Sequence, residues 1–189
     1  MKILVTGATG FVGRALVDGL LEGGHEITAF VRNLSSLLPN EVLQVIAGDL
    51  STWSLLNPAF NDKSKHALQD IDVVVHLAAR VHVMADCSND PLAEYLSANR
   101  DATLTLARAA DEADVKRFVY ISTIGVNGNI SSSPFTENST PAPHNFYAVS
   151  KYEAEQGLLA LAKESTIEIV TIRPPLVYGP NAPGNFSTL

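Results

Sequence analysis

A tyrosine and a lysine four residues apart, Tyr147 and Lys151, are the pair in this chain whose types and spacing suggest acid–base chemistry. On a helix, residues four apart project from one face about one turn apart. An ammonium group beside a phenol favours the phenolate, so we expect the pKa of Tyr147 to lie below its ordinary value of about 10. A tyrosine adjusted in this way can exchange a proton with a hydroxyl or carbonyl group of a substrate.

A glycine-rich segment near the start of the chain, LVTGATGFVGRAL, places Gly7, Gly10 and Gly13 at three-residue intervals. Gly7 permits a tight turn, Gly10 lets backbone amides approach a diphosphate, and Gly13 lets a helix pack close to a sheet. The N-terminus of that helix would present unpaired N–H groups to the anion. The spacing differs from the usual G-x-G-x-x-G, so a purely structural turn is the alternative interpretation. In a dinucleotide site, Tyr147 would exchange a proton with the substrate while a hydride moves to or from a nicotinamide.

The elements that must position these residues alternate between strands and helices. Short apolar runs predict strands, and longer periodic segments predict helices. The strands are expected at 2–6, 26–31, 42–47, 72–77, 117–122 and 167–172, and the helices at 11–24, 90–113 and 145–164. This alternation predicts a doubly wound parallel sheet, the three-layer α/β/α Rossmann fold. The polar segment 127–145 is long for a connection, which favours a functional loop near a site.

Composition excludes several other classes of protein. The chain has 189 residues, 46% of them hydrophobic, and a formal net charge of −7, which disfavours non-specific binding to nucleic acid. No apolar run reaches the roughly 18 residues that span a bilayer, and no signal peptide is evident, so we expect a cytoplasmic protein. The single cysteine, Cys87, fits a reducing compartment. No cluster has metal-ligand spacing, so no metal is expected.

Three polar residues receive structural interpretations. His76 ends an apolar strand, and we expect a buried, hydrogen-bonded histidine and not a catalytic one. Asp70 and Asp72 precede the same strand and are interpreted as solvated turn residues.

Six stretches, besides Asn99 in the long helix, are spread over essentially the whole chain. These are T-G-x-x-G-x-x-G at 6–13, GDL at 48–50, HLAAR at 76–80, STIGVNG at 122–128, YAVSK at 147–151 and RPPLVYGP at 173–180. In these stretches and in their order, the chain resembles the extended short-chain dehydrogenase/reductase family. That family includes UDP-glucose 4-epimerase-like nucleotide-sugar epimerases and dehydratases (the NAD-dependent epimerase/dehydratase proteins).

The resemblance implies a site in which Thr123, Tyr147 and Lys151 are catalytic, with Ser122 as the neighbour that could be confused with Thr123. It also implies a set of cofactor-binding residues: Gly7, Thr9, Gly10, Phe11, Val12, Gly13, Arg32, Asp49, Leu50, Leu77, Ala78, Ala79, Asn99, Tyr147, Lys151 and Pro174. The expected partner is a nucleotide sugar. Family members often pair through two helices, so 90–113 and 145–164 could form a homodimer.

The residue after the second expected strand bears on the choice between NAD and NADP. Enzymes that use NAD usually place Asp or Glu at the end of this strand to hold the ribose 2′-hydroxyl. Here that position is Val31, followed by Arg32, whose guanidinium could pair with a 2′-phosphate. NADP is therefore favoured over NAD, with an arginine facing solvent or stacking on adenine as the alternative.

Two departures from the family pattern bear on the reaction. Ile124 and Gly125 stand where the family's dehydratases usually carry an acid pair, which disfavours dehydration. Leu176 stands where an asparagine often touches the sugar nucleotide, which leads us to favour a 4-keto-sugar reductase over a 4-epimerase. A non-catalytic dinucleotide sensor remains a further alternative, although such proteins commonly lose the tyrosine or the lysine.

The resemblance also suggests a domain boundary. We expect residues 1–175 to form the dinucleotide-binding domain and 176–189 to begin a C-terminal substrate lobe that is largely missing. On that basis the 189-residue chain should bind cofactor and show little or no turnover by itself.

Overall fold

The computed structural model describes residues 1–33, 41–42, 44–50, 67–81, 89–179 and 182. Its centre is a six-stranded parallel sheet in the order β3-β2-β1-β4-β5-β6. The strands are β1 (Lys2–Thr6), β2 (Glu26–Val31), β3 (Gln44–Ala47), β4 (Val73–His76), β5 (Arg117–Ile121) and β6 (Glu168–Ile172). The order reverses between β1 and β4, which defines a doubly wound sheet with its crevice above that point.

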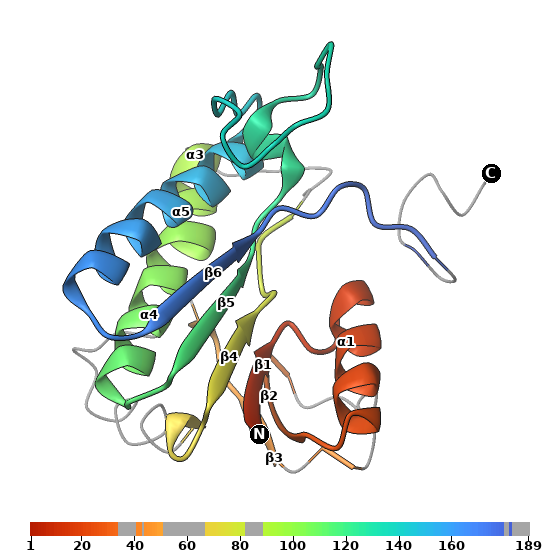
Figure 1. Ribbon diagram of the computed structural model, residues 1–189, viewed down its shortest axis with the longest axis vertical. Helices are drawn as coiled ribbons and strands as arrows, with labels where there is room; N and C mark the ends of the chain where they lie inside the picture. Colours follow the sequence, from red (N-terminus) through yellow and green to blue (C-terminus); the bar gives the residue numbers. More distant parts are fainter. Residues whose placement is uncertain (34–40, 43, 51–66, 82–88, 180–181, 183–189) are drawn as a thin grey trace.

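Helices cover both faces of the sheet, as Figure 1 shows. Helix α1 (Phe11–Glu22) lies on one face, and α3 (Pro91–Leu96), α4 (Ala102–Glu112) and α5 (Phe146–Glu164) lie on the other. A π-helical segment, η2 (Ser97–Asp101), joins α3 to α4, and a short 3₁₀ helix, η3 (Ile124–Asn127), follows β5. The expected three-layer α/β/α Rossmann fold is confirmed.

The core consists of two apolar clusters, one on each face of the sheet. Alternate residues of β1 point to opposite faces, so Leu4 packs in one cluster while Ile3 and Val5 pack in the other. Leu106 and Leu158 bring α4 and α5 onto the first cluster, and Val17 brings α1 onto the second. Burial on both faces explains why the strands are continuous apolar runs.

The long helix expected at 90–113 is three elements in the structure. Pro91 occupies the first turn of α3, where its missing N–H costs nothing, and Asp90 caps the helix by accepting a hydrogen bond from Ala93 N at 3.1 Å. The π-helical turn of η2 then interrupts the regular pattern around Asn99. Such a turn is frequent at functional sites and is not readable from hydrophobic periodicity.

Asp72 lies in a bend before β4 and is partly exposed, and it also makes specific contacts that the turn interpretation did not include. Its carboxylate accepts hydrogen bonds from Lys116 Nζ at 2.7 Å and from Lys2 N at 3.0 Å. Both contacts lower the pKa of Asp72 below its ordinary value, and the hydrogen bond from Lys116 is the larger cause. The Asp72 carboxylate therefore links the starts of β1, β4 and β5, at the amino ends of the strands and opposite the crevice. Asp70 is exposed, with a φ of 59°.

No helix in the described residues is long and apolar enough to cross a membrane. Across those same ranges, no three His, Cys, Asp or Glu side chains are grouped to hold a metal ion. Cys87 lies outside the described residues.

Candidate functional site

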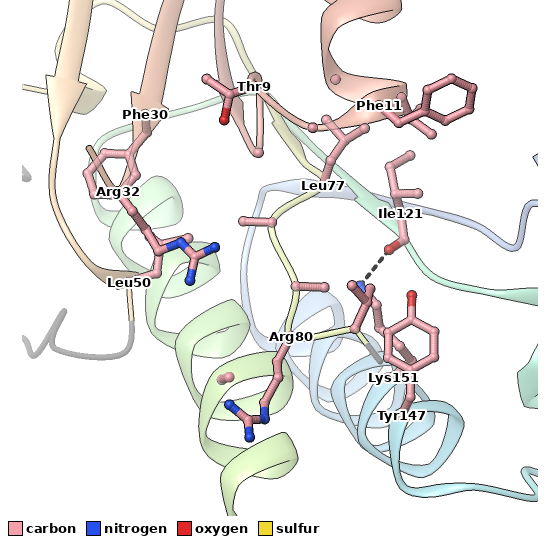
Figure 2. Close-up of a pocket in the computed structure, with 18 of the residues that line it drawn as sticks. Thr9, Phe11, Phe30, Arg32, Leu50, Leu77, Arg80, Ile121, Tyr147 and Lys151 are labelled. Atoms are coloured by element: carbon pink, nitrogen blue, oxygen red, sulfur yellow. Dashed lines mark hydrogen bonds between the residues drawn. The ribbon is translucent and has the colours of Figure 1, made fainter. Parts of the chain in front are cut away.

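A large pocket opens along the carboxyl ends of the strands (Figure 2). Every strand contributes to it through the segment that follows, and α5 closes one end with Tyr147 and Lys151. Parallel strands place all their carboxyl ends at one edge, so segments far apart in the sequence meet there. The pocket therefore lies where a doubly wound sheet binds its ligand.

The glycine turn forms the wall between β1 and α1. Gly7 has a φ of 70°, and a Cβ there would lie 2.8 Å from Ala78 N. A Cβ on Gly13 would lie only 2.1 Å from Gly7 O, so α1 can approach the turn only because that position is glycine. Gly10 caps α1 without any side-chain hydrogen bond, and no acidic residue stands in the first turn. The uncapped end and the missing side chains fit a diphosphate group.

Arg32 and Asp49 lie at the opposite end of the pocket from the tyrosine. Strand β2 ends at Val31, so Arg32 is the first residue beyond it, and its exposed side chain lines the pocket. No carboxylate stands at the end of β2. Asp49 and Leu50, which follow β3, line the same region.

Tyr147 and Lys151 lie in the first turns of α5, next to each other and facing the pocket (Figure 2). Asn145 caps this helix by accepting a hydrogen bond from Ala148 N at 2.8 Å, which fixes where the helix begins. Lys151 Nζ donates to the Ile121 carbonyl at 2.8 Å and lies 6.0 Å from the Tyr147 ring centroid. The predicted pairing on one helix face is thus present in the structure.

The expected lowering of the Tyr147 pKa is wrong for the chain without a bound dinucleotide. Burial, and secondarily Tyr95, raise the pKa of Tyr147 above its ordinary value. Burial also lowers the pKa of Lys151 to about 7, although Glu155 opposes the shift. A fully charged ammonium in water-like surroundings would have lowered the pKa of Tyr147, whereas both groups are desolvated here.

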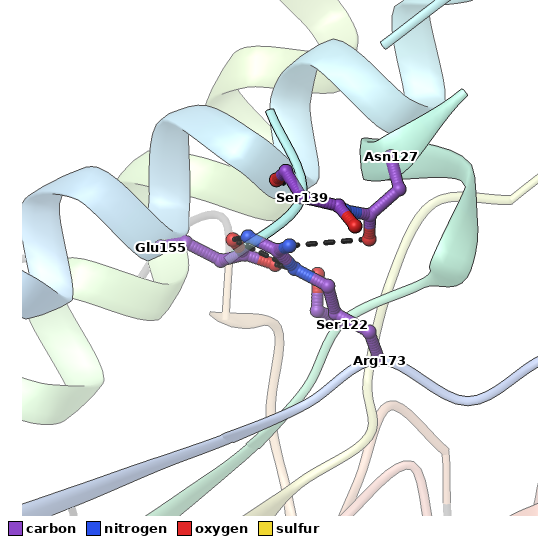
Figure 3. A network of polar contacts seen from close by, with 5 residues as sticks. All are labelled: Ser122, Asn127, Ser139, Glu155 and Arg173. Carbon is purple, nitrogen blue, oxygen red and sulfur yellow. Dashed lines mark hydrogen bonds and ion pairs between the residues drawn. The ribbon is translucent and has the colours of Figure 1, made fainter. Parts of the chain in front are cut away.

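Thr123 and the neighbouring Ser122 have different hydrogen bonds. Ser122 is buried, and its hydroxyl donates to a Glu155 carboxylate oxygen, as Figure 3 shows. Thr123 Oγ1 instead accepts a hydrogen bond from Gly125 N at 3.1 Å, so its own hydrogen stays available to donate. Both line the pocket, and of the two it is Ser122 whose hydroxyl hydrogen is committed to a carboxylate.

Glu155 and Arg173 form an ion pair behind this turn (Figure 3). The Arg173 guanidinium donates to both Glu155 oxygens, at 2.5 to 3.2 Å, and to Asn127 Oδ1 at 3.1 Å. Asn127 Nδ2 in turn donates to the Ser139 carbonyl. The network joins α5, the end of β6, η3 and the segment 127–145, which is how that polar segment is held near the site.

Asn99, which the family resemblance places at the cofactor, lies beneath the pocket and is fully buried. Its side chain accepts from Arg80 N at 2.7 Å and donates to Arg80 O at 3.0 Å and Ser150 Oγ at 2.9 Å. Asn99 is not among the described residues that line the pocket. Asn99 holds the segment after β4 and the start of α5 in place, so it would affect a bound ligand only by positioning these two segments.

His76 is buried and hydrogen-bonded, as expected, and its tautomer follows from its partners. Thr103 Oγ1 donates to Asn99 O, so it accepts from His76 Nε2 at 2.9 Å. Thr6 Oγ1 accepts from Ala78 N and therefore donates to His76 Nδ1 at 2.7 Å. The ring is neutral, with the proton on Nε2, and burial lowers its pKa to about 3.

All predicted cofactor and catalytic residues except Asn99 line this one pocket. Sequence reasoning missed several described residues that also line it: Phe30, Asn33, Gly48, Arg80, Val81, Glu94, Ser97, Ala98, Ile121, Ser122, Pro175 and Val177. Arg80 belongs to the HLAAR stretch and could have been included from it. Glu94 and Ser97 come from α3 and η2, and no sequence motif points to them.

The fold and the pocket define a dinucleotide-binding protein of the Rossmann type. A family model described as the NAD dependent epimerase/dehydratase family matches residues 3–188, and the chain belongs to that family.

Individual relatives agree with this assignment. The chain is 40% identical to the UDP-glucose 4-epimerase of Vibrio cholerae over 100% of its own length and 55% of that protein. It is 30% identical to human dTDP-D-glucose 4,6-dehydratase, over 95% of this chain and 52% of the relative. The chain thus spans about half the length of these curated relatives.

Solved structures show the same architecture. MoeE5 in complex with UDP-glucuronic acid and NAD superposes with a TM-score of 0.81 at 34% identity, over 98% of this chain and 58% of that one. The UDP-glucose 4-epimerase of Thermotoga maritima with UDP-glucose gives a TM-score of 0.79 at 30% identity, over 95% of this chain and 57% of that chain.

Proposed function

We propose that this chain is the dinucleotide-binding and catalytic part of an NAD(P)-dependent enzyme that acts at C4 of a nucleotide sugar. The observation that carries the proposal is the convergence of Thr123, Tyr147 and Lys151 on a pocket whose far wall is the glycine turn. The glycine turn at one end of the pocket suits the diphosphate of a cofactor, and the polar side chains at the other end suit proton transfer. When bound, the nicotinamide would supply the hydride acceptor or donor.

Each of the three residues has a role that its contacts support. Tyr147 is a buried phenol with a raised pKa, so in the resting site it holds a proton that it can give to a carbonyl oxygen. Thr123 would donate a second hydrogen bond to the same oxygen, which explains the need for a hydroxyl that is not committed elsewhere. Lys151, with a pKa of about 7, changes charge near neutral pH and so sets how readily Tyr147 gives up its proton.

Exchanging Tyr147 for Phe tests the catalytic role. In a protein that also carries a substrate lobe, turnover should fall by about 100- to 10,000-fold, the usual contribution of a general acid–base, while dinucleotide affinity changes little. Tyr152→Phe is the matched control, since Tyr152 lies on the same helix and does not line the pocket in the described structure. A Tyr147→Phe protein with full function would indicate a non-catalytic dinucleotide sensor instead.

Two reactions are compatible with this site, and separate observations favour each. The 40% identity to a UDP-glucose 4-epimerase favours 4-epimerisation. Two residues favour a 4-keto-sugar reductase that uses NADPH. Leu176, which is 66% exposed, stands where an asparagine often touches the sugar nucleotide, and Arg32 in the pocket suits a 2′-phosphate. Incubation of full-length protein with UDP-sugars separates them: an epimer mixture formed without added cofactor supports the epimerase, and stoichiometric consumption of NADPH supports the reductase.

The proposal includes binding of NADP at least as tight as that of NAD. Arg32 reaches into the pocket where β2 ends without a carboxylate, which suits a 2′-phosphate (Figure 2). Arg32→Gln should weaken NADP binding about tenfold and leave NAD binding unchanged, by the typical strength of a charged hydrogen bond. Arg108→Gln, on the exposed side of α4, is the control. Tighter binding of NAD than NADP by the unmodified chain would remove the NADP preference.

A further inference from the structure

The amino group of Lys151 is enclosed on the sheet side by strand β5. The residue is 1% exposed, and Nζ donates to the Ile121 carbonyl at 2.8 Å. The same nitrogen lies 4.5 Å from the centroid of the Tyr120 ring, well within the distance at which a cation is attracted to the face of an aromatic ring. Tyr120 itself is fully buried.

The Tyr120 ring is fixed from β4 as well. The His76 imidazole stacks on it at 5.9 Å between centroids with an interplanar angle of 20°. His76 is held in turn by Thr6 and Thr103, which leaves the stack little freedom to move. The ring therefore presents a fixed face to Lys151.

The groups that face Lys151 from the surrounding elements are few among the described residues. From β4 there is the neutral His76; from β5, the Tyr120 ring and the Ile121 carbonyl; and from α5, Tyr147 and the Glu155 carboxylate. Glu155 is already engaged by Arg173 and Ser122. Besides the Ile121 carbonyl and the Glu155 carboxylate, the aromatic face is thus a further group that favours a positive charge on Nζ.

We propose that Tyr120 is a positioning residue, whose ring face holds the Lys151 amino group in the site and stabilises its charged form. This inference deepens the proposed function, because Lys151 is the lysine of the proposed catalytic pair. Burial disfavours the ammonium, and the negative face of the ring opposes that effect. Tyr120 thereby sets the fraction of Lys151 that is charged near neutral pH.

The test is a graded series at position 120 in the 189-residue chain. Tyr120→Phe keeps the ring, and mono-, di- and trifluorinated phenylalanines at the same position weaken the negative face with little change in shape. The pKa of Lys151 is read from NMR titration of the lysine Cε–Hε groups, and Lys151→Arg assigns its signal among the six lysines. We expect Tyr120→Phe to leave the pKa of Lys151 unchanged and each added fluorine to lower that pKa. Tyr120→Leu should lower it by about one pH unit.

A titration that does not move across the fluorinated series would overturn the proposal. The fluorinated chains carry the test even where Tyr120→Leu fails to fold. Binding of NAD and NADP is measured on the same samples, so the two ideas can fail separately. A chain that binds neither dinucleotide while its Lys151 titration follows the ring would contradict the proposed function and support the role of Tyr120.

Discussion

The two halves of the sheet build their parts of the pocket by different means. In the half formed by β1–β3 and α1, the wall between β1 and α1 is a backbone turn, and its shape depends on glycines that let the chain approach itself closely. In the half formed by β4–β6 and α3–α5, the pocket rests on buried polar side chains. Among the residues that the structure describes, the buried polar ones from β4 onward are His76, Asn99, Thr103, Ser122, Asn127, Ser150, Lys151 and Glu155, against Thr6 and Thr28 in the first half.

Under the proposed function, this difference separates dinucleotide binding from proton transfer. Backbone amides have a fixed position and no titration near neutral pH, which suits recognition of a constant diphosphate. Buried side chains respond to burial and to each other, which suits proton transfer but makes that half sensitive to pH and to single substitutions. The halves should therefore fail differently when they are altered.

Gly13→Ala should produce the largest effect on dinucleotide binding, through the backbone-built half. A Cβ 2.1 Å from Gly7 O forces α1 away from the turn. Dinucleotide affinity should fall by about 100-fold, the cost of misplacing binding groups by roughly 1 Å. The measurement is fluorescence titration with NADPH or NADH.

Gly19→Ala is the matched control for this prediction. Gly19 lies on the same helix with nothing within 4 Å of an added Cβ. It should leave affinity unchanged and raise the free energy of unfolding by about 1 kcal/mol, because alanine favours a helix. Equal effects at the two positions would contradict the assigned role of the turn.

Arg173→Met should destabilise the side-chain-built half by about 3–5 kcal/mol, because it leaves the Glu155 carboxylate buried without its partner. The double variant Glu155→Met/Arg173→Met removes both charges and should recover most of this loss. Urea unfolding of the two variants measures the difference. A double variant as unstable as the single one would show that the ion pair is not the source of the loss.

His76 should make the stability of the same half depend on acid. The pKa of about 3 in the folded chain lies below the ordinary 6.5, so between these values the unfolded state binds more protons. Stability is therefore lost as the pH falls, by about 2 kcal/mol between pH 7 and pH 5. His76→Gln removes this contribution, and urea unfolding of both proteins at the two pH values checks it. Identical losses in both proteins would contradict a neutral buried imidazole.

The contrast also explains how much the sequence could predict. Strand positions and the glycine turn follow from apolar runs and from residue types that only a close approach requires, so β1 and β2 match their predicted ranges. The position of Tyr147 and Lys151 on one helix face follows from their spacing. The residues that line the pocket after each strand follow from the family resemblance and the parallel topology.

The chemical state of the site does not follow from spacing. The pKa of Tyr147 moved opposite to the prediction, because burial of the phenol raises it and the neighbouring Lys151 is itself desolvated, with a pKa of about 7. Asn99 and Asp72 found partners 19 and 44 residues away, which no local pattern contains. The π-helical turn in η2 likewise depends on packing and not on periodicity.

The most direct test of the central claim is a crystal structure of this chain with NADP or NAD bound. The account predicts the diphosphate against the amides of residues 10–13 and the nicotinamide ring beside Tyr147 and Lys151. A dinucleotide bound elsewhere, or bound here with both of those side chains turned away from its ring, would contradict it.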